Sequence, residues 1–210
     1  MDKPVIIFGS TGIAKAALEI FNSNGIIVYG FLDDEEANRG KEINSISVLG
    51  STDDQGYTGL IGKKCEAFIA TDDNEIRKEY VEYLNETRKV MPINAIHPSA
   101  IISDSFRLGQ GNFINASAIL SNDSKMGCHN IINSRAIIEQ EVEIGDFVQI
   151  GAGSTINSKV NIEDEAFIGS GVTIVASVTI KKGAQIGAGS VVISNVEAGK
   201  TVFGNPAQPI

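Results

Sequence analysis

The sequence predicts a small α/β domain over residues 1–92, followed by a parallel β-helix with a short C-terminal tail over residues 93–210. Two observations carry this prediction. The chain opens with the pattern strand, glycine turn, helix, strand, and every sixth residue from Ile96 to Val192 is Ile, Leu, Val or Met. An uninterrupted short repeat is typical of a solenoid, in which each repeat packs on its neighbours.

The opening pattern is that of a Rossmann-like β-α-β unit. A continuous apolar run at 5–8 indicates a buried strand, and the residues after the glycine turn have one apolar face, which indicates a helix. A second apolar run ends at the pair Asp33-Asp34. The expected elements of this domain are strands at 5–8, 26–32 and 66–70 and helices at 13–22 and 72–88.

The glycine turn at 9–12, Gly-Ser-Thr-Gly, is part of a dinucleotide-binding fingerprint. A lone Gly-x-x-Gly is a weak signal, because it also marks close packing of a strand on a helix. A helix that begins after such a turn offers free N–H groups to a phosphate. Asp33 and Asp34 follow the second strand, at the edge where open α/β sheets bind ligands. The alternative is that both are solvated loop carboxylates.

The six-residue repeat excludes a helix, because each step of six turns a helical position by about 240° net and would spread the aliphatic residues over three faces. A coil with three short sides fits, with one inward residue per side and about eighteen residues per turn. Small or β-branched residues recur four positions later, except at Phe106, Asn112 and Asn130. Glycine and aspartate directly after the isoleucine, as at Gly145 and Asp146, are expected at the corners.

Composition excludes several function classes. A net charge of −9 argues against nucleic acid, because binding phosphates requires concentrated Lys and Arg. No apolar run is long enough to span a bilayer, and the N-terminus does not resemble a signal peptide, so a cytoplasmic protein without membrane partners is expected. Cys65 and Cys128 are too far apart for a metal-ligand spacing, and no metal is expected.

The order of the segments along the whole chain resembles the hexapeptide-repeat nucleotide-sugar acetyltransferases, which include sialic acid O-acetyltransferases and N-acetyltransferases of 4-amino sugars. The resemblance implies a left-handed β-helix and a homotrimer that binds acetyl-CoA between neighbouring β-helices. It also implies that the α/β domain binds a nucleotide-linked sugar. The segments that carry it are IIFGSTGIAK, FLDD, IATDDNEIR, NAIHPSAIIS, the hexads and the tail VFGNPAQPI.

The same resemblance assigns binding residues to both parts of the chain. The residues expected to bind the sugar nucleotide are Gly9, Ser10, Thr11, Gly12, Ile13, Asp33 and Asp34. Those expected to lie along CoA are Ser158, Gly169, Ser170, Gly187 and Ala188.

The expected catalytic position carries an amide. In the relatives, the segment matching 138–141 usually has histidine followed by an acidic residue, whereas this chain has Gln140 and Glu141. An amide can hold the nucleophile by a hydrogen bond, but it has no useful basicity near neutral pH. Ile13, Gln149 and Ser158 also depart from the family pattern. Two functions remain open: an acetyltransferase that works with Gln140 and Glu141, or an impaired homologue that binds sugar nucleotide or CoA without catalysis.

Overall fold

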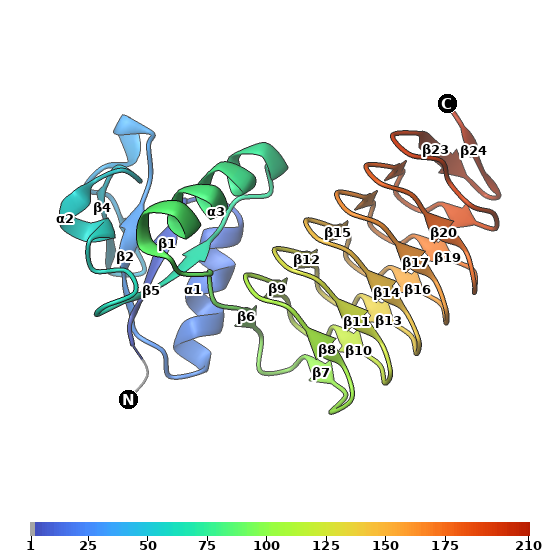
Figure 1. The fold of residues 1–210 in the computed structure, drawn as a ribbon, viewed down its shortest axis with the longest axis horizontal. Helices are drawn as coiled ribbons and strands as arrows, with labels where there is room; N and C mark the ends of the chain where they lie inside the picture. Colours follow the sequence, from blue (N-terminus) through green and yellow to red (C-terminus); the bar gives the residue numbers. More distant parts are fainter. Residues whose placement is uncertain (1–2) are drawn as a thin grey trace. The chain divides into compact units, whose positions relative to one another are not determined.

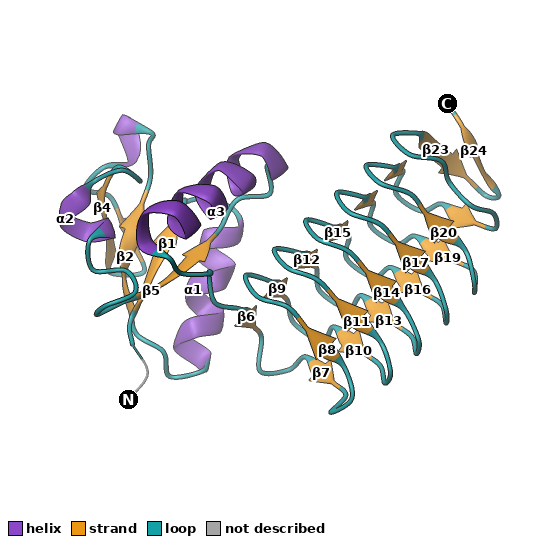
Figure 2. Cartoon of the chain, viewed as in Figure 1, coloured by secondary structure: helices purple, strands orange, loops and turns teal. Residues whose placement is uncertain are grey.

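The computed structural model describes residues 3–210, which form two compact units, one up to Pro98 and the other Ser99–Ile210. Figures 1 and 2 show an α/β unit and a regular stack of short-stranded coils. The division falls a few residues after the boundary expected from the sequence. Among the described residues, no helix has the length and apolarity needed to cross a membrane.

The first unit is built on a five-stranded sheet in the order β3-β4-β2-β1-β5. Strands β1, β2, β4 and β5 run parallel, and only β3 is antiparallel to its neighbour. Strand β1 is wholly buried, as expected for a central parallel strand. The bounds of the strands are β1 Val5–Phe8, β2 Val28–Leu32, β3 Glu42–Ile43, β4 Ile46–Gly50 and β5 Glu66–Ile69.

Two long helices complete this unit, α1 (Ile13–Ser23) and α3 (Asn74–Arg88). Helix α1 buries an apolar face. Phe21 on that face makes an edge-on contact with Phe68 of β5, with ring centroids 5.5 Å apart. Helix α3 begins two residues later than predicted, because the Asp73 side chain caps it by accepting hydrogen bonds from two backbone N–H groups. Four further elements form between β2 and β5, where none was predicted from the sequence. They are β3, β4, η1 (Glu36–Asn38) and α2 (Gln55–Thr58).

The second unit is a β-helix whose sides are three parallel sheets. From β7 to β22, paired strands are eighteen residues apart, as in Ile119 with Ile137, so the predicted three-hexad coil is confirmed. Each sheet takes the name of its first strand after Ser99: the β7 sheet, the β8 sheet and the β9 sheet.
The β7 sheet contains β7 Ile101–Ile102, β10 Ile119–Leu120, β13 Ile137–Ile138, β16 Thr155–Ile156, β19 Thr173–Ile174 and β22 Val191–Val192. The β8 sheet contains β8 Arg107–Leu108, β11 Lys125–Met126, β14 Glu143–Ile144, β17 Asn161–Ile162 and β20 Thr179–Ile180. The β9 sheet contains β9 Phe113–Ile114, β12 Ile131–Ile132, β15 Gln149–Ile150, β18 Phe167–Ile168, β21 Gln185–Ile186, β23 Thr201–Gly204 and β24 Ala207–Pro209. Strand β6 (Ala95–Ile96) precedes the unit.

The sixth-residue ladder forms the core of the β-helix. Its members from Ile114 to Val192 are all buried. The two asparagines that break the small-residue row are also buried and are held by hydrogen bonds along the stack. Asn130 donates its N–H to Asn112 Oδ1 at 2.8 Å, and Val148 donates its N–H to Asn130 Oδ1 at 2.6 Å. The amides therefore stay in the row because they accept the N–H of the next coil.

The corner positions differ from the prediction. The left-handed backbone conformation falls three residues after the ladder residue, as at Glu141 (φ 57), and not directly after it. Glycine directly after the ladder residue serves close stacking of coils. At Gly151 an added Cβ would lie 2.4 Å from the backbone nitrogen of Ser170 in the next coil, and at Gly145 it would meet Asp164 Oδ1 at 2.3 Å.

Gly151 and Gly153 lie in the same turn, and substitution of each tests one requirement: close stacking of coils at Gly151 and a left-handed backbone at Gly153. Gly151→Ala forces backbone apart and is expected to lower the free energy of unfolding by about 3 kcal/mol. Gly153→Ala has open space around it but a φ of +69, and it is expected to cost only about 1 kcal/mol. Denaturant unfolding of the two variants measures the difference. Equal losses would contradict the stacking role of Gly151.

Candidate functional site

A cavity of about 150 Å³ lies at the carboxyl ends of β1, β2 and β5 in the first unit. This is the edge where open α/β sheets bind ligands. It brings together six residues expected to bind substrate, namely Gly9, Thr11, Gly12, Ile13, Asp33 and Asp34. The other residues that line it are Ala70, Thr71, Asp72, Ile76 and Tyr80.

Asp33 organises the rim of this cavity. The Ser10 hydroxyl, which is buried, donates to Asp33 Oδ2. The Asn38 amide reaches the same oxygen at 3.3 Å, and the N–H of Glu35 donates to Asp33 Oδ1 at 2.8 Å. Ser10 therefore supports the site through Asp33. Three donors fix the carboxylate, and it keeps acceptor capacity for a ligand.

Asp34 is held by a second set of donors. It accepts the N–H and the hydroxyl of Thr52, both at 2.8 Å, and the hydroxyl of Tyr80 at 3.0 Å. Burial alone would raise the pKa of Asp34, but these hydrogen bonds outweigh it and the pKa is lowered. The Asp34 carboxylate is therefore ionised at neutral pH. Burial, reinforced by the bond to Asp34, raises the pKa of Tyr80 to about 12.

The raised pKa of Tyr80 gives a measurable signature. Since the folded state holds the phenolic proton more tightly than the unfolded chain, the stabilisation is fully present below pH 10 and is lost as the pH rises towards 12. Ultraviolet difference titration of the folded protein is expected to show one tyrosine ionising near pH 12. Tyr80→Phe removes that phase, whereas persistence of the phase in Tyr80→Phe would contradict the assignment.

Thr71, Asp72 and Tyr80 also line the cavity, but they were not predicted from the sequence as site residues. A signal existed for the first two, since the stretch IATDD ends a strand in the same way as FLDD. Both stretches lead into the same edge of a parallel sheet. Tyr80 lies on the second turn of α3, and its contact with Asp34 spans 46 residues, so no local pattern indicates it.

On the β-helix, Gln140 and Glu141 lie in the turn between β13 and β14, at one corner of the coil. Gln140 is exposed, and its carbonyl accepts the N–H of Lys159 in the next coil at 3.2 Å. Glu141 Oε2 lies 3.7 Å from Lys159 Nζ, both side chains being exposed. Ser158 occupies the corresponding turn between β16 and β17, directly after Gln140 in the stack.

The other four residues expected along CoA fall at another corner. Gly169 and Ser170 follow β18, and Gly187 and Ala188 follow β21 in the next coil. These turns lead into the β7 sheet, whereas the turn of Gln140 leads out of it. Within one chain, the two groups thus lie along opposite edges of the β7 sheet. Gln149, a further departure from the family pattern, is on β15 in the β9 sheet.

A larger cavity of about 450 Å³ lies at the C-terminal end of the β-helix. The hairpin β23–β24 contributes Val202 and Ala207–Pro209 to its lining, and Lys200 supplies a cationic side chain. The Gly-Asn-Pro-Ala segment of the tail forms the turn of this hairpin. The cavity is lined by both apolar and polar residues, which suits a ligand that combines an aromatic ring with charge.

His129 does not lie at the corner of Gln140. It is buried at a corner between the β8 and β9 sheets, and its ring stacks on Phe147 with centroids 5.0 Å apart. Gly111 makes room for it, because a Cβ there would lie 2.2 Å from His129 Nδ1. Packing accounts for this histidine. Among residues 3–210, no group of His, Cys, Asp or Glu is arranged to hold a metal ion.

Comparison with known proteins defines the class. Residues 4–84 match the PglD N-terminal domain family. The structure of PerB from Caulobacter crescentus, in complex with CoA and GDP-perosamine, superimposes with a TM-score of 0.90 at 29% identity, covering 99% of this chain and 97% of that one. The acetyltransferase domain of PglB from Neisseria gonorrhoeae, in complex with acetyl coenzyme A, matches with a TM-score of 0.88 at 25% identity over the full length of both chains.

WeeI from Acinetobacter baumannii gives a TM-score of 0.87 at 25% identity, with 99% of each chain covered. No curated protein sequence gives a significant match. The fold and its full-length matches make this chain an acetyltransferase with an N-terminal α/β unit and a left-handed parallel β-helix. Its N-terminal unit is similar to the PglD N-terminal domain family, and its whole fold is similar to that of the sugar N-acetyltransferase PerB.

Proposed function

We propose that the protein transfers the acetyl group of acetyl-CoA to the amine of a nucleotide-linked amino sugar. One observation carries this proposal: the chain shares its whole fold with an enzyme named perosamine N-acetyltransferase, crystallised with CoA and GDP-perosamine. The cavity of Asp33 and Asp34 supports it, because two fixed carboxylates accept hydrogen bonds from the hydroxyl or N–H groups of a nucleoside.

In this proposal the β-helix carries the chemistry. The amine nitrogen forms a bond to the thioester carbonyl carbon, the C–S bond breaks, and CoA leaves as the thiol with the proton that the nitrogen loses. Gln140 holds the amine by a hydrogen bond, and Glu141 is the adjacent carboxylate that matches the acidic residue of the family pattern. An amine that arrives neutral needs only alignment and stabilisation of the oxyanion, so a strong base is dispensable.

A second function follows from the amide at position 140. The perosamine enzyme with one histidine replaced by asparagine was still crystallised with CoA and GDP-perosamine, so an amide in that enzyme is compatible with binding of both ligands. If Gln140 corresponds to that position, the protein would bind a sugar nucleotide or CoA as a non-enzymatic module. Measured binding without turnover would favour this function.

We also propose that the working form is a homotrimer. Gln140 and four of the five expected CoA-binding residues lie along opposite edges of the β7 sheet, so a neighbouring β-helix is needed to bring them to one site. The outward residues of that sheet carry no charge, which suits contact with a second copy. They are Ile101, Ile119, Ile137, Thr155, Thr173 and Val191. Sedimentation equilibrium tests the trimer, and a monomer at assay concentration would contradict it.

Steady-state kinetics test the proposed function. Purified protein is incubated with acetyl-CoA and a panel of UDP-, GDP- and dTDP-linked 4-amino sugars, and release of the CoA thiol is recorded. We expect turnover with at least one member and none with the 4-hydroxy analogue, which lacks the amine. Tight binding of both substrates without thiol release would reject catalysis, and absence of binding would reject both functions.

A further inference from the structure

Arg77 is the largest fully buried side chain described in the structure, and the proposed mechanism does not use it. It lies on the first turn of α3 and is only 2% exposed. Removing a guanidinium from water is costly unless its donors are satisfied by nearby groups. The groups to which Arg77 donates hydrogen bonds should therefore explain why a cation is buried at this place.

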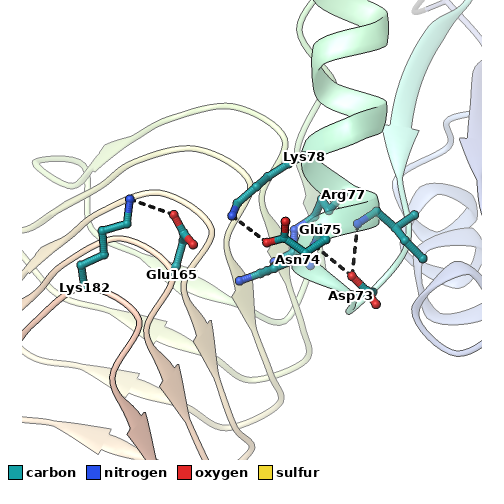
Figure 3. A network of polar contacts seen from close by, with 8 residues as sticks. Asp73, Asn74, Glu75, Arg77, Lys78, Glu165 and Lys182 are labelled. Atoms are coloured by element: carbon teal, nitrogen blue, oxygen red, sulfur yellow. Dashed lines mark hydrogen bonds and ion pairs between the residues drawn. The ribbon is translucent and has the colours of Figure 1, made fainter. Parts of the chain in front are cut away.

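Arg77 holds the loop that precedes its own helix. Its guanidinium donates to the backbone carbonyl of Thr71 at 2.7 Å and to the side-chain oxygen of Asn74. Figure 3 shows the start of α3, where the Asp73 side chain caps the helix and Arg77 lies beside Asn74. One rigid, planar group thus ties Thr71, in the loop from β5 to α3, to Asn74, the first residue of the helix.

That loop forms one wall of the cavity in the α/β unit. Ala70, Thr71 and Asp72 line it, together with the glycine turn and the pair Asp33-Asp34. A carbonyl fixed at Thr71 fixes the position of its side chain and of Asp72. The geometry of this wall therefore depends on Arg77, although Arg77 itself does not line the cavity.

Arg77 also bears on the charge of the cavity. Three carboxylates line it, those of Asp33, Asp34 and Asp72, and a nucleoside diphosphate brings further negative charge. Burial lowers the pKa of Arg77 to about 10, against the opposing influence of Asp72 and Asp73, so the side chain is protonated at neutral pH. It is a fixed positive charge behind the wall that carries Asp72.

We propose that Arg77 is a positioning residue for the sugar nucleotide, which sets the loop of Thr71 and Asp72 and offsets the charge of its carboxylate. The proposal rests on the proposed function and adds a residue that controls binding of one substrate only. Acetyl-CoA, which we assign to the β-helix, should be bound without help from Arg77.

The test compares Arg77→Lys and Arg77→Met with a matched arginine on the same helix. Arg88 donates to Thr58 Oγ1 at 2.8 Å and to Gln55, and neither partner lines the cavity. Arg88→Met therefore removes a comparable set of hydrogen bonds away from the cavity. The dissociation constants for the sugar nucleotide and for acetyl-CoA are measured by calorimetry, and kcat and both KM values by thiol release.

We expect Arg77→Lys to raise the dissociation constant and KM for the sugar nucleotide about tenfold, because the charge stays but the two-point contact is lost. Arg77→Met is expected to raise them about a hundredfold. Binding of acetyl-CoA and the KM for it should stay within about twofold in both variants. Arg88→Met should leave the affinities for both substrates unchanged.

Several results would overturn the inference. One is a folded Arg77→Lys protein that binds sugar nucleotide like the wild type, and another is a rise in KM shared equally by both substrates. If Arg77→Met does not fold, Arg77→Lys decides alone. Failure of the wild-type protein to bind any sugar nucleotide would instead reject the proposed function, and the positioning role with it.

Discussion

Gln140→His is expected to increase kcat/KM for acetyl transfer by about 10²- to 10⁴-fold. A histidine at this corner supplies a base whose pKa lies near neutrality, and general base catalysis is worth about that much. Gln140 is exposed in the turn between β13 and β14, so the larger ring enters without displacing the core. Thiol release with a 4-amino sugar nucleotide measures the gain across pH 5 to 9, in the range where histidine titrates.

The gain should follow the ionisation of the new imidazole, falling away below about pH 6.5. Gln140→Leu, which removes the amide without adding a base, is the matched control and should lower activity. Equal activity of the histidine and glutamine proteins at all pH values would place the chemistry away from this corner.

Asp33→Ala is expected to weaken sugar nucleotide binding by about a hundredfold or more. The change removes an acceptor for the ligand, and it leaves the buried Ser10 hydroxyl and the N–H of Glu35 without their shared partner. Acetyl-CoA binding should not change. Calorimetric titration with each ligand separates the two effects.

Asp53→Ala serves as the control, because Asp53 is exposed and accepts a hydrogen bond from Ser51 at 2.6 Å outside the cavity lining. It should bind both ligands like the wild type. If Asp33→Ala retained full affinity for every sugar nucleotide that the wild type binds, the cavity would not be the nucleotide site.

The strand register of the β-helix was predictable to the residue because the sequence pattern is periodic. An inward residue every six positions fixes the number of residues per coil, and the pairing of Ile119 with Ile137 follows from it. The reason for the glycines was not predictable. Gly151 is needed because the backbone of Ser170 approaches it, and this approach exists only once the coils are stacked.

The cavity of the α/β unit was predictable where local signals exist. The glycine turn and the carboxylates after β2 are recognisable in the sequence, and they supply part of the cavity lining. Tyr80 and Arg77 belong to a helix whose sequence shows only an amphipathic pattern, and their roles come from contacts with Asp34 and the Thr71 carbonyl. Long-range hydrogen bonds of this kind leave no spacing rule in the sequence. The sequence also did not show that the turns of Gln140 and Gly169 lie along opposite edges of the β7 sheet. The strand order of the structure shows it.

The central claim is that this chain acetylates an amine of a nucleotide-linked sugar while carrying glutamine at position 140. The most direct measurement is the mass of the sugar nucleotide after incubation with isotopically labelled acetyl-CoA and the wild-type protein. We expect the label to appear on the amino sugar, with one CoA thiol released for each acetyl group transferred. An unlabelled sugar nucleotide, recovered under conditions in which both substrates are bound, would contradict the claim.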